Sequence, residues 1–332
     1  MSALLELQGV TVRYRQADGR GLELPAVADA SFRVGEREML GLVGESGCGK
    51  TTLGRAILRL VPLAGGEVRW RGQRIDDLDR HRFRALRREL QLVFQDPNSC
   101  LDPRMTIAHS VAEPLRALMP ELAAAGRALR VTRQLAEVGL PQEFAERYPH
   151  QLSGGQLQRA VIGRALVVDP RFVVCDEPVS ALDVSVQGQI VNLLARIRRE
   201  RGLASLFISH NLAVVARLCE RILVMYRGRI VEAAPREAVI RAPLHPYTRE
   251  LLDAVPAIDA GAKRRVLARS IGRATVDAAE GVSGCPFALR CPHAQPRCQA
   301  ERPALRPVGD GHLVACHRAD EWPRGLPPLV PG

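Results

Sequence analysis

The sequence predicts an α/β fold in which helices cover a mainly parallel β-sheet. Two observations lead to this prediction: strand-like apolar runs alternate with helical stretches, and a glycine-rich turn joins one such run to a helix. The chain has 332 residues, of which 46% are hydrophobic and 25% are charged. It therefore has enough apolar material for a sizeable core.

The first strands are expected near the N-terminus. Residues 4–14 and 28–36 alternate apolar and polar side chains, which is typical of half-buried strands. The apolar run Met39–Val43 is predicted to be a buried strand, and it leads directly into GESGCGKTT. We expect a helix to begin near Lys50, at the end of this glycine-rich turn.

The alternation continues through the middle of the chain. A basic helical stretch at 80–90 precedes the strand-like QLVFQ, and residues 96–149 are expected to be mostly helical. A second series follows, with predicted strands at 172–177, 205–209 and 222–231 and predicted helices at 186–200 and 211–220.

The character of the sequence changes after residue 243, where a loop-like stretch with four cysteines begins. We therefore expect a main α/β domain at 1–243, with a helical subdomain at about 96–160, and a C-terminal extension at 244–332. The net charge of +11 suggests contact with nucleic acid or acidic lipid head groups, but the basic residues are scattered and form no long block.

The expected compartment follows from what the sequence lacks. The N-terminal segment has no basic leader, and no run approaches the roughly 18 apolar residues that would cross a bilayer. We therefore expect a soluble, cytosolic chain, in which structural disulfides are disfavoured.

Gly44–Thr51 match the phosphate-loop pattern G-x-x-x-x-G-K-[ST]. The glycines let successive backbone N–H groups converge on phosphate oxygens at a helix N-terminus. Lys50 can reach the β- and γ-phosphates, and the Thr51 hydroxyl can ligate Mg²⁺. The predicted nucleotide-binding residues are Gly44, Glu45, Ser46, Gly47, Cys48, Gly49, Lys50, Thr51 and Thr52.

Two adjacent carboxylates follow the apolar strand that begins at Phe172. Asp176 is placed to hold Mg²⁺, usually through water, and Glu177 to polarise an attacking water molecule. Either acidic residue alone fits a simple strand cap. Together, and downstream of a phosphate loop, they indicate a nucleotide-hydrolysing site.

Leu152–Gln156, followed by QRA, resemble the signature sequence of ABC-transporter ATPases. Further motifs of that family occur in the same order. Tyr14 matches the aromatic residue that stacks on adenine, Gln95 the Q-loop, Ser180–Asp183 the D-loop, and His210 the switch histidine.

The resemblance implies an ABC-type nucleotide-binding domain, a P-loop NTPase core with an antiparallel β subdomain and a helical subdomain. It implies ATP and Mg²⁺ as ligands, with Gln95 also at the metal, and Glu177, His210 and Gln95 as catalytic residues. In the family, the signature turn faces ATP bound to a second subunit. The matching residues are Ser153, Gly154, Gly155 and Gln156.

Four stretches narrow the resemblance to the ATP-binding subunits of oligopeptide, dipeptide and nickel importers. They are FQDPNSCLDPR, DEPVSALDVSVQ, RGRIVE and HPYTRELL. The chain departs from that subfamily at Cys100 and Asp102, where Ser and Asn are frequent, and at Cys48, which occupies a variable loop position. None of these positions carries a catalytic group.

The resemblance to this subfamily implies an ATPase that powers peptide import from the cytoplasmic face of the inner membrane. The implied partners are two membrane permease subunits, a second ABC ATPase subunit, identical or homologous, and an extracytoplasmic substrate-binding protein, with no nucleic acid. Alternatives are an importer of nickel or another small solute, a soluble ABC ATPase acting on nucleic acid or ribosomes, and an exporter ATPase.

The C-terminal cysteines are a separate question. Cys285, Cys291, Cys298 and Cys316 have the spacing C-x5-C-x6-C-x17-C, which lacks the C-x2-C pairs of most structural zinc sites. Four thiolates on irregular loops can ligate an iron–sulfur cluster. Similar tails in the peptide-importer ATPases imply a 4Fe–4S cluster in some members. The alternatives are zinc, with His293 or His317 as a further ligand, and no metal at all.

Overall fold

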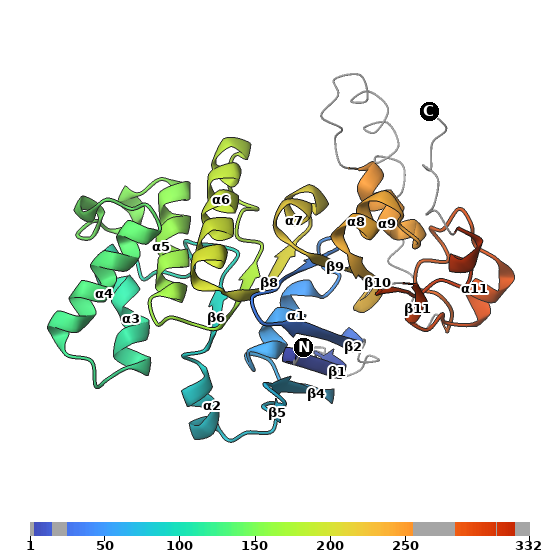
Figure 1. Cartoon of the computed structure of the whole chain (residues 1–332), viewed down its shortest axis with the longest axis horizontal. Helices are drawn as coiled ribbons and strands as arrows, with labels where there is room; N and C mark the ends of the chain where they lie inside the picture. Colours follow the sequence, from blue (N-terminus) through green and yellow to red (C-terminus); the bar gives the residue numbers. More distant parts are fainter. Residues whose placement is uncertain (1–2, 15–24, 255–282, 310, 323–332) are drawn as a thin grey trace.

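The computed structural model describes residues 3–14, 25–254, 283–309 and 311–322. Its centre is an eight-stranded sheet (Figure 1). In spatial order the strands are β11 (Arg306–Gly309), β12 (His312–Val314), β10 (Arg229–Pro235), β9 (Arg221–Tyr226), β3 (Met39–Val43), β8 (Ala204–Ser209), β7 (Phe172–Asp176) and β6 (Leu90–Val93). Strands β9, β3, β8, β7 and β6 run parallel, and β10, β12 and β11 continue the sheet in antiparallel pairs.

The parallel strands are buried on both faces. In β3, Leu40 and Leu42 belong to one hydrophobic cluster, while Met39 and Val43 belong to the other. Successive side chains of a strand point to opposite faces, so an uninterrupted apolar run is what a doubly covered strand requires. This explains the near-continuous hydrophobicity from which the core strands were predicted.

A smaller antiparallel sheet covers one face of the core sheet. Its order is β2 (Pro25–Gly35), β1 (Ala3–Arg13), β4 (Gly65–Trp70) and β5 (Gln73–Arg74). Helix α1 (Lys50–Ile57) contacts β7 and β8 of the core sheet and also β1 and β2, so it is packed between the two sheets. This helix begins at the predicted residue.

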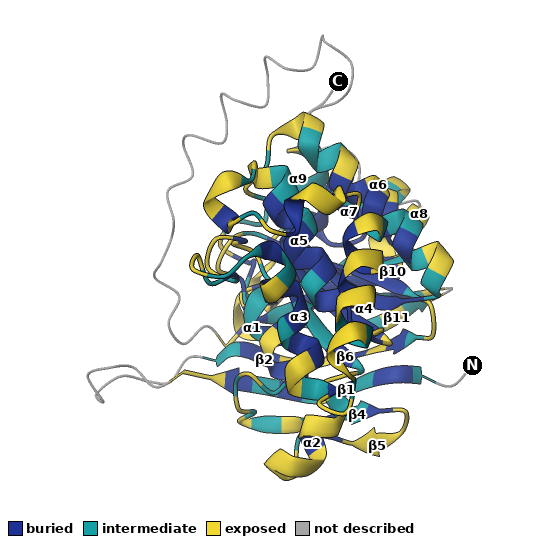
Figure 2. Ribbon diagram, turned by 90° about the vertical axis from the view of Figure 1, so that its left-hand side faces the viewer, coloured by how far each residue is buried: buried dark blue, intermediate teal, exposed yellow. Residues whose placement is uncertain are grey.

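Helices cover the other face and one end of the core sheet (Figure 1). Those on the face include α6 (Val184–Arg201), α7 (Leu212–Leu218), α8 (Arg236–Arg241) and α9 (Pro246–Asp253). The group at the end comprises α3 (Ile107–Leu118), α4 (Ala124–Glu137) and α5 (Gly154–Leu166), with the short 3-10 turns Gln142–Phe144 and Pro149–Gln151. Helix α2 (Arg80–Leu86) lies between β5 and β6 in the chain. Figure 2 shows exposed residues on the outer sides of these helices and buried residues inward.

One predicted strand is wrong. The run 222–231 was expected to be a single strand, but it forms the hairpin β9–β10. Arg227 and Gly228 have φ values of 43° and 78°, and two consecutive residues with positive φ make the tight turn that joins antiparallel strands.

The C-terminal residues are attached to the core and also pack against one another, because Leu244, Val314 and Ala319 form a small hydrophobic cluster of their own. Strand β12 pairs with β10, and Phe287 is 1% exposed within the cluster that includes α5, α6 and α7. The described tail also contains α11 (Pro296–Ala300) and a 3-10 turn, Ala319–Glu321. No helix among the described residues has the length and apolar character needed to span a membrane.

Candidate active site

The predicted site residues gather at the carboxyl edge of the core sheet. The glycine-rich loop follows β3, His210 follows β8, Asp176 ends β7, and Gln95 lies two residues beyond β6. These four strands are parallel neighbours in the order β3, β8, β7, β6, so their carboxyl ends lie side by side. In open α/β sheets this edge is where ligands bind.

The glycines of the loop allow backbone segments to approach closely. A Cβ atom on Gly44 would lie 2.2 Å from the carbonyl oxygen of Met225, and one on Gly49 would lie 2.2 Å from that of Ala26. Gly49 also has a φ of 107° at the N-cap of α1, a conformation that residues with a Cβ rarely adopt. The loop is therefore held against β9 and β2, with the N-terminus of α1 behind it.

Lys50 and Thr51 place a cation and a hydroxyl group at this loop. Lys50 is 4% exposed, and its Nζ donates hydrogen bonds of 2.8 Å to the carbonyl oxygens of both Gly44 and Glu45. The Thr51 hydroxyl donates to Oδ1 of Asp176 at 2.9 Å. Burial raises the pKa of Asp176, against the opposing effects of the Thr51 hydrogen bond and Arg55. A bound cation would favour the ionised carboxylate.

Glu177 is the meeting point of the other predicted catalytic side chains. Nδ1 of His210 lies 3.0 Å from Oε2 of Glu177, and Nε2 of Gln95 donates to the same oxygen at 3.5 Å. Glu177 has a φ of 45°, which is costly for a residue with a side chain, and its backbone N–H donates to the carbonyl of Ile208. Backbone strain of this kind is concentrated at functional sites, and here it aims the carboxylate at His210 and Gln95.

The remaining loop and adenine-site residues lie around this centre. The hydroxyl groups of Tyr14 and Thr52 are 3.3 Å apart, which puts the predicted adenine-stacking ring beside the first turn of α1. Tyr14 is 48% exposed, so its ring is accessible. Ser46 and Gly47 are exposed, while Cys48 is 7% exposed, and burial raises the pKa of its thiol.

The signature turn is not part of this cluster. Ser153 caps α5: its Oγ accepts a hydrogen bond from the N–H of Gln156 at 3.4 Å, and its own N–H donates to Gln156 Oε1 at 2.9 Å. Gly154 next to it is exposed. Figure 1 shows α5 in the helical group, away from α1. The structure therefore presents two separate phosphate-binding candidates, one of which has its own set of hydrolytic side chains.

A contact between the phosphate loop and the C-terminal tail was not predicted from the sequence. The Glu45 carboxylate pairs with Arg290, and the Glu45 N–H donates to the hydroxyl of Tyr247 at 2.7 Å. Tyr247 belongs to the HPYTRELL stretch, whose only sequence signal was its similarity to the peptide- and nickel-importer ATPases, and the structure shows that the residue is buried.

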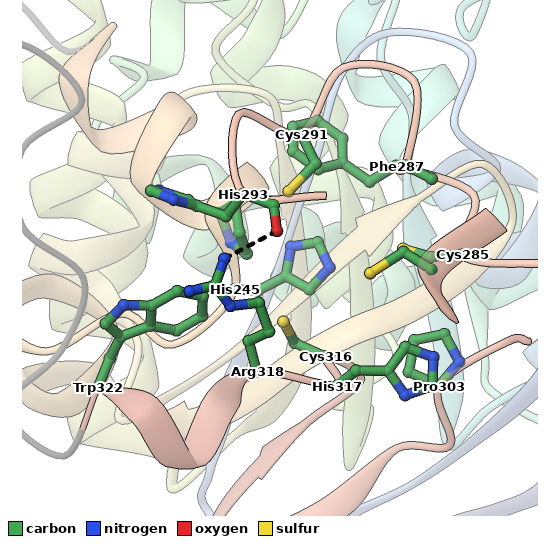
Figure 3. A pocket seen from close by; sticks show the side chains of 13 residues that line it. His245, Cys285, Phe287, Cys291, His293, Pro303, Cys316, His317, Arg318 and Trp322 are labelled. Carbon is green, nitrogen blue, oxygen red and sulfur yellow. Dashed lines mark hydrogen bonds between the residues drawn. The ribbon is translucent and has the colours of Figure 1, made fainter. Parts of the chain in front are cut away.

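The four tail cysteines line one small cavity (Figure 3). All eight cysteines of the chain are free thiols in the structure. Figure 3 shows the sulfur atoms of Cys285, Cys291 and Cys316 directed into the same space. Burial raises the pKa of Cys291 to about 11 and that of Cys316 to about 12, and the other tail cysteines add to both shifts. No three His, Cys, Asp or Glu side chains of the described ranges are arranged to hold one metal ion.

Comparison with known families gives two matches. The family model described as "ABC transporter" matches residues 27–180, and the model described as "Oligopeptide/dipeptide transporter, C-terminal region" matches residues 231–298. The first contains the phosphate loop, the signature turn and the Asp176–Glu177 pair. The second contains Tyr247, Arg290 and three of the four tail cysteines.

Individual proteins are similar over nearly the whole chain. The oligopeptide transport ATP-binding protein OppF of Escherichia coli K12 is 43% identical over 323 residues, which is 96% of each chain. The putative oligopeptide transport ATP-binding protein YkfD of Bacillus subtilis 168 is 44% identical over 302 residues, covering 90% of this chain and 91% of that protein.

Two solved structures share the fold. A dimeric post-hydrolysis state of the ATP-binding cassette MJ0796, bound to ADP and Pi, has a TM-score of 0.64 at 29% identity and covers 70% of this chain and 98% of that one. CbiO1 from Clostridium perfringens, part of the transporter complex cbiONQ, has a TM-score of 0.63 at 25% identity, covering 72% and 91%.

Proposed function

This chain belongs to the ABC transporter family, as an ATP-hydrolysing subunit of the oligopeptide-transport type, and from that premise we propose that it powers the import of peptides. One observation carries the proposal. Phosphate-loop, metal-binding and hydrolytic side chains meet at one sheet edge, in a chain whose tail matches the oligopeptide/dipeptide transporter region.

The proposed roles follow from the contacts. Lys50 and the backbone N–H groups of the loop bind the phosphates of ATP, and Tyr14 stacks on its adenine. Glu177 takes up a proton from the attacking water, with His210 and Gln95 fixing the orientation of its carboxylate.

Magnesium fits the oxygen atoms present. The Thr51 hydroxyl and Asp176 carboxylate are adjacent, the Gln95 amide provides a further oxygen, and hard oxygen ligands are those that Mg²⁺ prefers. Mg²⁺, when bound, neutralises charge on the β- and γ-phosphates.

The active assembly requires other subunits. Because the signature turn from Ser153 to Gln156 lies apart from the chain's own phosphate loop, it is available to ATP held by a second ABC ATPase subunit. We assign two membrane permease subunits and an extracytoplasmic substrate-binding protein as further partners. The chain would then act as a peripheral protein on the cytoplasmic side of the membrane. The domain division at residue 243, with residues 96–160 as the helical subdomain, remains part of this proposal.

We further propose a 4Fe–4S cluster at Cys285, Cys291, Cys298 and Cys316. Its support is that all four thiols line one cavity, and that cysteine sulfur is the only ligand type such a cluster needs. Each iron of the cluster takes one thiolate, so the ligands stand further apart than those of a single ion. Zinc, the alternative, needs its ligands around one ion, an arrangement absent from the described residues.

The function is tested with Glu177→Gln in the complex co-expressed with its permeases. The variant should bind Mg-ATP, accumulate as an ATP-bound dimer of ATPase subunits, and lose at least about 100-fold in hydrolysis, because general-base catalysis contributes about 10²–10⁴-fold. Turnover at the wild-type rate would show that Glu177 is not the general base. Failure of the chain to co-purify with any membrane subunit would contradict the transport function.

The cluster is tested by anaerobic purification. We expect brown protein with about four irons per chain, which is lost in Cys291→Ser and retained in Cys48→Ser. Colourless protein with one zinc per chain would show that the four cysteines bind zinc and not a cluster. Protein with neither metal and an ordered tail would reject both.

A further inference from the structure

An ion pair joins the C-terminal tail to the phosphate loop. Nη1 of Arg290 donates to Oε2 of Glu45 at 3.0 Å, and Nη2 donates to Oε1 at 2.8 Å. This is a bidentate ion pair between residues that lie 245 positions apart in the chain. The same Nη2 also donates to Glu250 on α9. The Arg290 side chain is 24% exposed and that of Glu45 is 42% exposed, so the guanidinium is partly removed from solvent, and its two hydrogen bonds fix the geometry of the pair as well as its charge.

Tyr247 holds the backbone of the same loop residue. Its hydroxyl accepts the N–H of Glu45 at 2.7 Å, and the residue is fully buried. On the other side of this segment, Lys50 donates to the Gly44 and Glu45 carbonyl groups. The peptide that Tyr247 restrains is therefore the one against which the phosphate-reaching lysine rests.

An aromatic platform keeps both tail residues in place. Tyr226 at the end of β9 contacts Tyr247, with ring centroids 4.6 Å apart, and Phe287, with centroids 5.3 Å apart. The Arg290 guanidinium lies over Tyr226 at 5.7 Å and over Phe287 at 5.5 Å from their centroids. Because Tyr226 is in the strand next to β3, the platform is anchored in the core sheet and the guanidinium has little freedom to leave Glu45.

We propose that Arg290 and Tyr247 are positioning residues of the ATP site, through which the tail holds the Glu45 end of the phosphate loop ready for triphosphate. The proposal rests on the phosphate-binding role of residues 44–51. Arg290 acts in two ways: it fixes the Glu45 side chain, and it neutralises a carboxylate that otherwise repels the phosphates. Tyr247 fixes the backbone, which lowers the ordering cost of binding.

The charge of Glu45 distinguishes this role from simple attachment of the tail. Without Arg290, the Glu45 carboxylate is left uncompensated in a loop that must accept a highly negative ligand, so nucleotide affinity falls. Removing the Glu45 charge as well removes that repulsion. A contact that only attaches the tail predicts no such recovery of affinity.

The experiment measures Mg-ATP affinity of the full-length chain by calorimetry, with thermal stability recorded for each variant. Arg290→Met keeps the apolar length over the aromatic rings and should weaken affinity about tenfold. Glu45→Gln alone is the reference without the carboxylate charge, and the double variant should return to the affinity of that reference. Tyr247→Phe should weaken affinity several-fold.

The matched control is Arg297→Met. Arg297 pairs with Glu301 at 2.8 Å in the same tail, but both side chains are more than half exposed, and affinity should be unchanged. Unchanged affinity in Arg290→Met, or a double variant that binds no more tightly than Arg290→Met, overturns the proposal. If Arg290→Met does not fold, Tyr247→Phe decides: unchanged affinity in that variant also overturns it. Lys50→Ala tests the proposed function separately from the role of the tail. Unaltered affinity in that variant would refute the phosphate-binding role of the loop itself.

Discussion

His245 connects the stability of the chain to pH. It is 1% exposed and caps α9, where its Nδ1 accepts a hydrogen bond from the N–H of Tyr247 at 3.1 Å. Nδ1 can accept only in the neutral imidazole. Burial lowers the pKa of His245 to about 4, against the opposing charge of Glu232, so the folded chain keeps this ring neutral well below its ordinary pKa of 6.5.

The direction of the pH effect follows from this difference. A histidine that is harder to protonate in the folded state contributes stability above pH 6.5, and this stability is lost as the pH falls from 6.5 towards 4. At about 1.36 kcal/mol per pH unit, the difference between the two pKa values corresponds to about 3 kcal/mol.

The assay compares urea unfolding of the wild type and His245→Asn at pH 7 and at about pH 4.5. Asparagine is a favourable N-cap residue that can accept the same hydrogen bond, but it does not titrate. The carboxylates are the same in both proteins, so the wild type should lose about 2–3 kcal/mol more than the variant between these pH values. Equal losses would refute the assignment of a neutral, buried His245.

Three further predictions test the loop and the tail attachment, the first with a control substitution in α6. Gly49→Ala should abolish hydrolysis, because its Cβ would lie 2.2 Å from a backbone oxygen. Gly188→Ala is the control: it lies inside α6 with open space around it, and it should raise the free energy of unfolding, measured in urea, by up to about 1 kcal/mol. Lys50→Ala should weaken Mg-ATP binding about 10- to 100-fold by calorimetry, and wild-type affinity would contradict its phosphate contact. Glu232→Ala should lower the free energy of unfolding, measured in urea, by about 3–5 kcal/mol, because it leaves the buried His312 and two backbone N–H groups without their acceptor. A loss below about 1 kcal/mol would contradict that network.

The active-site cluster could be predicted from the sequence because its geometry follows from topology. The phosphate loop and the Asp176–Glu177 pair each follow or end a strand of an α/β alternation, and parallel strands bring those ends to one edge. Gln95 and His210 were assigned through the resemblance to ABC-transporter ATPases. Thr51 and Asp176 are 125 positions apart, yet their contact is implied once both strands are assigned to one parallel sheet. The D-loop stretch Ser180–Asp183 follows the Asp176–Glu177 pair in the chain, as expected from the motif order.

The tail contacts could not be predicted, because no local pattern specifies their partners. Strands β11 and β12 are short and contain arginine, proline and histidine, so neither has a strand-like periodicity. The structure shows that the extension adds Phe287 to the main core, while Leu244, Val314 and Ala319 form a small cluster within the extension. The Arg290–Glu45 pair joins two residues that look like ordinary surface charges in the sequence.

The order of strands decides which property of the enzyme the tail can influence. The phosphate loop follows β3, which has β8 on one side and β9 on the other. The hydrolytic residues Gln95, Glu177 and His210 all come from the β8 side, whereas Tyr226, Tyr247 and Arg290 reach the loop from the β9 side. A change in the tail therefore reaches the loop without passing through the residues that activate water. Loss of the Arg290 contact should accordingly raise the KM for ATP while leaving kcat within about twofold, since it removes binding that ground state and transition state share. A fall in kcat at unchanged KM, measured with the intact transporter, would show instead that the tail acts on Glu177.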